Sequence, residues 1–394
     1  MHQPIDSPVA HCGIIINSGS RDENSEQHGI AHLIEHLIFK GTQKRRAHHI
    51  LSRMEDIGGE INAYTTKEET CVYASFFNNY YSRAFELIAD IVFHSTFPEK
   101  EIRKEKEVIY DEINSYKDSP VDLIYDDFEE QIFHPNSIGR NILGTENSLQ
   151  NIGRNQLLEF YNSTYSTQEM VVSVVGKIPF KRVVNYFERY FSEITLKMRL
   201  TPRISFDRSS FKSTWKETEK QTFQTHCIIG NLAYSNREEK RFILHLLNNI
   251  LGGPGMNSRL NMSLREKKGL AYNIESNYTT YSDIGLLHIY FGADRKDLNR
   301  CIEAIYRETN LLCHRELGTL QLSKAKRQLI GQIAIASENF ENLMLANGRS
   351  ILIFDDIDPL DKITKKISAI TARQLLDTAN EVLIQYLLSG LIYK

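Results

Sequence analysis

The amino-acid sequence predicts an α+β protein made of two similar, duplicated α/β-sandwich domains. In each domain we expect a mixed or antiparallel sheet with helices packed on one face. Three observations support this prediction. Early segments recur in the same order later in the chain, strand and helix patterns are mixed in both halves, and 394 residues suffice for two or more domains of about 100–200 residues each.

The first half contains a strand and a polar loop at residues 11–24, then a helical stretch at residues 29–42. Residues 58–77 follow as strand, turn and strand. The second half repeats these patterns in the same order, at residues 226–240, 241–255 and 269–291. A repeat of roughly 200 residues indicates duplication of a whole domain, because solenoid repeats span only about 20–50 residues.

The segment between the halves, residues 196–210, is basic, contains Pro202 and has no sustained period. We therefore predict an N-terminal domain at residues 1–197, a linker at 198–210 and a C-terminal domain at 211–394. Helices are predicted at residues 80–94, 99–116, 121–133, 181–191, 297–316, 320–335 and 371–384.

Composition excludes several functional classes. The formal net charge of -3 gives no electrostatic case for a nucleic acid or an anionic membrane as partner. The sequence has five scattered cysteines and no C-x-x-C pair, so we expect reduced thiols and no cysteine-built zinc site. No apolar run approaches the roughly 18 residues of a spanning helix, and the first ten residues lack the pattern of a signal peptide. These features predict a cytoplasmic location.

One motif carries recognisable metal chemistry. His32 and His36 are four residues apart, so on a helix both imidazoles lie on one face and can hold one zinc ion. Glu35 leans over the same face, which suits a base that takes a proton from an attacking water. By chance the pattern H-x-x-E-H is expected about 0.03 times in a chain of this composition, so the motif is specific.

A third ligand is available on the acidic helix predicted at residues 99–116. Glu105 and Glu112 are two turns apart and share a face of this helix. Chemistry alone does not choose the ligand among Glu105, Glu107, Asp111 and Glu112. A single glutamate here is also a weak signal, because the acidic face of a helix is usually only solvated.

Residues 20–42, which contain this motif, resemble the zinc helix of the pitrilysin, insulinase and mitochondrial processing peptidase family, the inverted zincins of the H-x-x-E-H type. Residues 58–65, 134–145 and 165–177 match further segments of the family, so the resemblance covers nearly the whole chain. It is similar to the bacterial members that act as two-domain subunits, each one half of a clamshell.

The resemblance implies roles for individual residues. The family's third ligand follows the second histidine at a spacing that selects Glu112, and a glutamate seven residues earlier, here Glu105, supports metal binding or catalysis. The family's edge strand pairs with the substrate backbone. In this chain it corresponds to Gly59, Asn62, Ala63, Tyr64 and Thr65.

The second half resembles the family segment in which an arginine and a tyrosine reach the substrate from the opposite half of the clamshell. These residues are Arg265 and Tyr272. The second copy of the zinc helix, at residues 245–249, has lost the glutamate and the second histidine, so we expect one zinc ion per chain. A homodimer would supply the second half of the clamshell. The chain also starts at the family's second strand, so we expect an uncovered sheet edge where the first strand would lie.

These residues predict a zinc metalloendopeptidase that cuts peptides or unfolded segments inside a dimeric chamber. Glu35 would act as base, and Arg265 or Tyr272 would stabilise the oxyanion. Two alternatives remain. One is a non-catalytic core or assembly subunit of a related peptidase complex, which would require a broken motif or a missing Glu112. The other is a metal-dependent hydrolase of non-peptide substrates.

Overall fold

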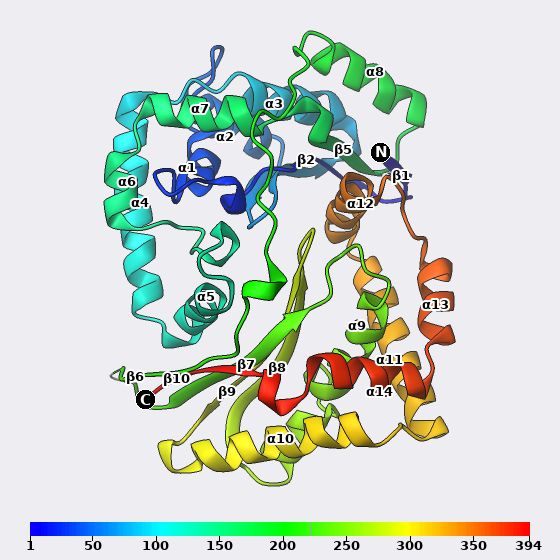
Figure 1. Cartoon of the computed structure of the whole chain (residues 1–394). Coiled ribbons are helices and arrows are strands. Elements are labelled where there is room, and N and C mark those ends of the chain that lie inside the picture. Colours follow the sequence, from blue (N-terminus) through cyan, green and yellow to red (C-terminus); the bar gives the residue numbers. More distant parts are fainter. Residues whose placement is uncertain (221) are drawn as a thin grey trace. The chain divides into compact units, whose positions relative to one another are not determined.

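The computed structural model describes residues 1–220 and 222–394 and contains two compact units, each built on a five-stranded sheet (Figure 1). The first unit consists of Met1–Ser115, Arg140–Ile204 and Ile335–Asp358. The second unit consists of Tyr116–Gly139, Ser205–Ala334 and Pro359–Lys394.

The sheet of the first unit has the strand order β1-β5-β2-β4-β3. Its strands are β1 (His2–Pro4), β2 (Val9–Ile16), β3 (Glu60–Thr65), β4 (Thr70–Phe77) and β5 (Met170–Gly176). β1 pairs with β5 in parallel, and the other pairs are antiparallel. The prediction that this edge is uncovered is therefore wrong where β1 pairs with Val174, Val175 and Gly176. β1 occupies it, and three residues are too few to show an alternating pattern in the sequence.

The sheet of the second unit has the equivalent order β6-β10-β7-β9-β8. Its strands are β6 (Trp215–Thr218), β7 (Thr225–Ala233), β8 (Ala271–Thr280), β9 (Gly285–Ala293) and β10 (Ser389–Tyr393). Again the first edge strand is parallel to its neighbour and the other pairs are antiparallel. The predicted duplication of an α+β domain is confirmed by this shared topology.

Most helices of the first unit pack on one face of its sheet. They are α1 (Ile30–Leu37), α2 (Ala47–Glu55), α3 (Tyr81–Phe93), α4 (Glu99–Lys117), α6 (Glu146–Asn151), α7 (Arg154–Thr164) and α8 (Phe180–Phe191). Side chains alternate along a strand, so Ala10, Cys12 and Ile14 of β2 point into this helical layer. There they join the buried side chains of α1 and α3 in one core.

The second unit has the same arrangement, with Cys227 and Ile229 of β7 in a core shared with buried leucines of α9. Its helices are α9 (Arg241–Gly252), α10 (Leu298–His314), α11 (Thr319–Ser337), α13 (Leu360–Ala369) and α14 (Ala372–Val382). Every helix predicted from the sequence is present, and most ends differ by at most two residues. The exceptions are α1 and α9, which end at Leu37 and Gly252, before the predicted ends at residues 42 and 255.

Each sheet also carries one helix on its opposite face, and this helix comes from the other half of the sequence. α12 (Phe340–Phe354) lies beside β2 and β5 of the first sheet, as Figure 1 shows. α5 (Pro120–Phe133) packs on β7 and β10 of the second sheet. Gly348 permits the close approach of α12, because a Cβ there would lie 2.3 Å from Cδ1 of Ile15.

This exchange changes the predicted domain ranges of 1–197 and 211–394. The compact units change over between Ile204 and Ser205, inside the predicted linker, but α5 belongs to the second unit and α12 to the first. The physical reason is that an amphipathic pattern identifies a helix with a buried face and does not say which sheet buries it.

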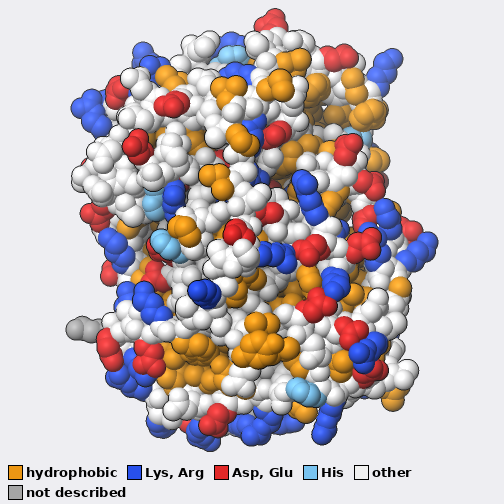
Figure 2. Space-filling view, in the orientation of Figure 1, with side chains coloured by type: hydrophobic (Ala, Val, Ile, Leu, Met, Phe, Trp, Pro, Cys, Tyr) orange, Lys and Arg blue, Asp and Glu red, His pale blue; other side chains and the backbone are white. Residues whose placement is uncertain are grey.

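The surface and the helix lengths add two observations. On the face drawn in Figure 2, acidic and basic side chains are interspersed. Among the described residues, no helix combines the length and the apolar character needed to cross a membrane.

Candidate metal centre

Helix α1 is short and is fixed at its start by a buried glutamate. Gly29 precedes the helix with a φ of 94°, a left-handed conformation that favours glycine. The backbone N–H groups of Gly29 and Ala31 donate to the two carboxylate oxygens of Glu23, at 3.0 and 2.9 Å. Burial raises the pKa of Glu23 to about 8, although these two hydrogen bonds oppose the shift. Glu23 was not predicted from the sequence, because no spacing rule links it to the zinc motif.

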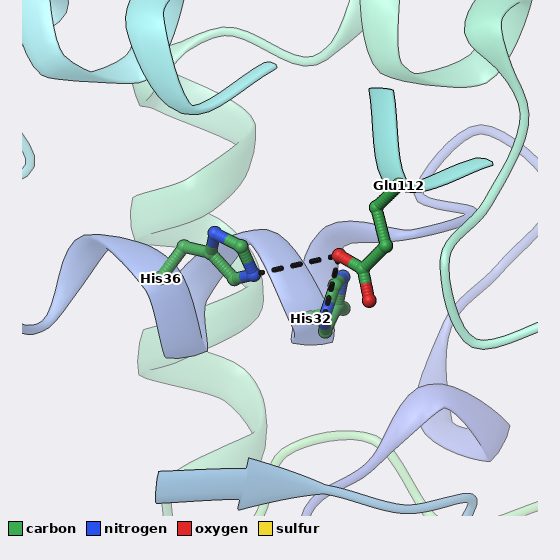
Figure 3. Close-up of side chains that lie close together, drawn as sticks. All are labelled: His32, His36 and Glu112. Atoms are coloured by element: carbon green, nitrogen blue, oxygen red, sulfur yellow. Dashed lines mark ion pairs between the residues drawn. The ribbon is translucent and has the colours of Figure 1, made fainter. Parts of the chain in front are cut away.

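Three predicted ligands meet where α1 faces α4. Nε2 of His32 lies 3.8 Å from Oε2 of Glu112, and Nε2 of His36 lies 3.9 Å from the same oxygen. Figure 3 shows both imidazoles turned toward this carboxylate. One ligand atom from each residue lies within 4.8 Å of the others. Of the four carboxylates that the sequence left open, Glu112 is the one placed with both histidines.

The arrangement fits a zinc ion. Two atoms bonded to one tetrahedral zinc ion at about 2.0–2.2 Å lie roughly 3.3–3.6 Å apart, so small side-chain rotations would close the site. Burial, and then the neighbouring His36, lower the pKa of His32 to about 3. His32 is therefore a neutral imidazole with a lone pair for a metal. Two imidazoles and one carboxylate are a donor set typical of catalytic zinc.

Glu105 holds His36 in position instead of joining the ligands. Nδ1 of His36 donates to Oε2 of Glu105 at 3.2 Å, which leaves Nε2 free for the metal. The other oxygen of Glu105 forms an ion pair with Nζ of Lys40 at 2.8 Å. Lys40 was missed by the sequence analysis. The available signal was its spacing, since it follows His36 by four residues.

Glu35 has the environment of a base whose proton affinity is increased. Burial raises its pKa, and the charge of Glu112 raises it further. The polar groups of Thr65 and the charge of His36 oppose this shift. A carboxylate with a raised pKa accepts a proton more readily near neutral pH.

The predicted peptide-binding strand is β3, which lies at the edge of the first sheet beside α1. Among the described strands only β4 pairs with β3, so the other side of β3 presents unpaired backbone groups. Asn62, Ala63, Tyr64 and Thr65 belong to the strand, and Gly59 directly precedes it. Ala63 packs against the core, whereas Asn62 is exposed.

Arg265 and Tyr272 lie on the surface of the second unit. Arg265 is exposed in a π-helical turn, Asn261–Glu266. Tyr272 is at the start of β8, 54% exposed, and its hydroxyl donates to Oδ1 of Asp294 at 3.1 Å. Their role at the zinc ligands of a partner subunit stays a prediction.

The second copy of the zinc helix, α9, contacts the neighbouring strand β8 through the residues at the motif positions. Its His245 is exposed, and the ring lies against Tyr278 with the ring centroids 4.6 Å apart. Asn248, at the position equivalent to Glu35, donates to the backbone of Ser276 at 3.0 Å. The described residues contain one cluster of metal-binding type, formed by His32, His36 and Glu112.

Two different family models match successive parts of the chain. Residues 3–146 match the family described as Insulinase (Peptidase family M16), and residues 151–329 match the Peptidase M16 inactive domain. The protein named "Uncharacterized zinc protease YmxG" of Bacillus subtilis is 33% identical over 94% of this chain and 89% of its own length. A protein of Rickettsia felis named "Uncharacterized zinc protease" is 33% identical over 96% of this chain and 91% of its own length.

Two solved structures share the fold. A protease from Helicobacter pylori superposes with a TM-score of 0.90 at 20% identity, covering 100% of this chain and 96% of that chain. A structure described as a peptidase M16 inactive domain, from Pseudomonas fluorescens, gives a TM-score of 0.92 at 18% identity, covering 100% of this chain and 94% of that chain.

Proposed function

The chain belongs to the insulinase family of peptidases (Peptidase family M16), and from that premise we propose that it is a zinc metalloendopeptidase of the inverted zincin type. The observation that carries this proposal is the convergence of His32, His36 and Glu112 beside the half-buried Glu35. The names of the two bacterial relatives, both zinc proteases, support it.

The proposed mechanism assigns each residue one task. His32, His36 and Glu112 would hold zinc, which when bound supplies a Lewis acid that makes water more acidic and polarises a carbonyl group. Glu35 accepts a proton from the attacking water and then passes it to the nitrogen of the leaving amine. Glu105 keeps the His36 ring oriented throughout.

The substrate would be a peptide or an unfolded segment in extended form. The unpaired side of β3 can add such a segment as a further strand through backbone hydrogen bonds. Backbone pairing reads little of the side-chain identity, so we expect broad sequence tolerance within a chamber of limited size.

We further propose that the working enzyme is a homodimer. Each site would take its zinc ligands from one subunit and Arg265 and Tyr272 from the other, where they would stabilise the oxyanion. This arrangement gives two equivalent sites and one zinc ion per chain.

Metal analysis combined with a peptide digest tests the proposal. Protein purified without chelator should contain one equivalent of zinc per chain. Mass spectrometry of a peptide mixture should show new internal cleavages that disappear with chelator and return with added zinc. Full zinc occupancy without any cleavage would instead favour the non-catalytic subunit, and hydrolysis of non-peptide substrates alone would favour the third class.

A further inference from the structure

A residue from the last quarter of the chain completes the end of the proposed peptide-binding strand. Nε of Arg349, on α12, donates to both carboxylate oxygens of Glu69, at 2.8 and 3.0 Å. Its Nη2 donates to the hydroxyl of Tyr64 at 3.1 Å, and that hydroxyl donates to Oε1 of Glu69 at 2.9 Å. These three residues form a closed group, here called the Arg349 network.

The Arg349 network spans the strand and the turn that follows it. Tyr64 belongs to β3, and Glu69 ends the turn at residues 66–69. The N–H of Thr66 donates to the carbonyl oxygen of Glu69 at 2.8 Å, and the N–H of Glu69 donates to Oγ1 of Thr66 at 3.1 Å. Thr65 lies between the two parts of the network and interacts with Glu35. Arg349 therefore holds the end of the β3 edge and the turn that follows it.

The Arg349 network depends on the guanidinium group of Arg349, because the carboxylate of Glu69 is buried. Glu69 is only 7% exposed, and Arg349 is its ion-pair partner. Without Arg349 the carboxylate would be buried without a counter-charge, which is unfavourable unless it takes a proton or moves to solvent. Either outcome disturbs its hydrogen bond with Tyr64. Lysine is a poor replacement, because its ammonium group does not match the two oxygens of a carboxylate.

The attachment of α12 to the sheet does not depend on Arg349. The hydroxyl of Ser173 donates to the carbonyl oxygen of Met344 at 2.7 Å, and the hydroxyl of Ser75 donates to Oε2 of Glu341 at 2.8 Å. The close contact between Gly348 and Ile15 adds apolar packing. Loss of Arg349 should therefore leave the helix in place and confine the disturbance to the turn and the strand edge.

We propose that Arg349 is a positioning residue of the peptidase. Acting through Glu69 and Tyr64, it holds the edge of β3 in the conformation that receives an extended peptide. This inference rests on the proposed function, since the binding of peptide to β3 is part of that proposal.

Binding measurements test the inference separately from catalysis. The affinities of two labelled unstructured peptides are measured in a Glu35→Gln background. One peptide is long enough to pair along β3, and the other covers little more than the scissile bond. Adding Arg349→Gln should weaken binding of the long peptide by roughly tenfold or more, as expected for a displaced binding edge. Binding of the short peptide should change much less. Glu341→Gln is the matched control, because it removes the charge from another contact between α12 and the sheet, and it should leave both affinities unchanged.

Two further measurements separate positioning from general damage. The double variant Arg349→Gln/Glu69→Gln buries no unpaired charge and should recover most of the long-peptide affinity. In the active protein, Arg349→Gln should raise KM for the long peptide while kcat and zinc content stay close to wild type. Unchanged binding of the long peptide, equal weakening by Glu341→Gln, or failure of the double variant to recover would each overturn the inference. If the wild-type protein cleaves no peptide, the proposed function is refuted. The binding comparison would still show whether Arg349 positions the edge of β3.

Discussion

Glu105 accepts a hydrogen bond of 3.2 Å from Nδ1 of His36, and its other oxygen pairs with Lys40. The carboxylate is buried, so this contact is shielded from water. It fixes the orientation of the imidazole and leaves Nε2 to face Glu112. Glu105 and Glu112 lie on one helix and share a face, yet they contact different nitrogens of His36, and we expect their substitutions to differ in effect.

Glu112→Gln should release zinc, because it removes the anionic ligand. Glu105→Gln should weaken zinc binding by about 10–100-fold, the usual cost of losing a partner that orients a ligand. Competition with a calibrated chelator measures both affinities. Glu101→Gln is the control, since Glu101 lies on the same helix and pairs with Lys104 near the surface. Equal zinc loss in the Glu105 and Glu112 variants would contradict the division of roles.

Glu35→Gln should keep zinc and lose activity. The amide has the size of the carboxylate but cannot take a proton, so turnover should fall by at least about 10²-fold. Zinc content by elemental analysis and cleavage of a fluorogenic peptide are the two readouts. Loss of the metal in this variant would show that Glu35 is itself a ligand.

A mixing experiment tests the shared site. Glu35→Gln subunits and Arg265→Ala subunits should each be nearly inactive alone. After subunit exchange half of the dimers are hybrids, and each hybrid has one intact site, so activity should recover to roughly a quarter of wild type. Zero recovery despite demonstrated exchange would mean that each site is built within one chain.

Substrate size should limit cleavage. A chamber formed by two subunits admits flexible chains and excludes folded domains. A small protein should resist cleavage in its folded form, and a destabilised point variant of the same protein should be cut at a rate that follows its unfolded fraction. Rapid internal cleavage of the folded form would argue against an enclosed site.

Acid should destabilise the protein through a buried histidine in the second unit. Burial lowers the pKa of His288 to about 4, and neither ring nitrogen has a hydrogen-bond partner among the described residues. An unfolded histidine titrates near 6.5, so as pH falls the unfolded chain binds this proton first. The free energy of unfolding should therefore decrease between about pH 6.5 and 4, by up to ~3 kcal/mol from this group.

Urea unfolding of zinc-free protein at several pH values measures this decrease. His288→Leu should flatten the pH dependence, whereas His48→Leu, at an exposed position, should not. An unchanged slope in the His288 variant would place the acid sensitivity elsewhere.

The sequence predicted the candidate metal-binding residues better than the residues that hold the neighbouring strand in place. His32 and His36 could be paired from helix geometry alone, because their spacing is local. Glu112 required the family resemblance, since chemistry did not distinguish it from Glu107 or Asp111, and the fold separates them by exposing those two. The Arg349 network joins residues 280 positions apart, and no local pattern records such a contact.

The fold shows the same limit. Period and composition identified most helices and the strands β2, β3 and β4 of the zinc-bearing half, and the same order of patterns recurred in the second half. The pattern of α5 predicted a helix but gave no indication of its sheet, α12 was not predicted, and β1 was too short to carry any alternation. Both depend on tertiary packing, which a local pattern does not specify.

The exchange of α5 and α12 has a consequence for how the protein is made. During synthesis, β1 to β5 leave the ribosome well before α12. The face of the first sheet that α12 covers therefore stays exposed until residue 354 has emerged. Uncovered apolar faces in a nascent chain invite aggregation and are what chaperones shelter. A chain that stops short of α12 would leave this face open and would lack Arg349. Synthesis itself therefore delays completion of the proposed peptide-binding edge until α12 has emerged.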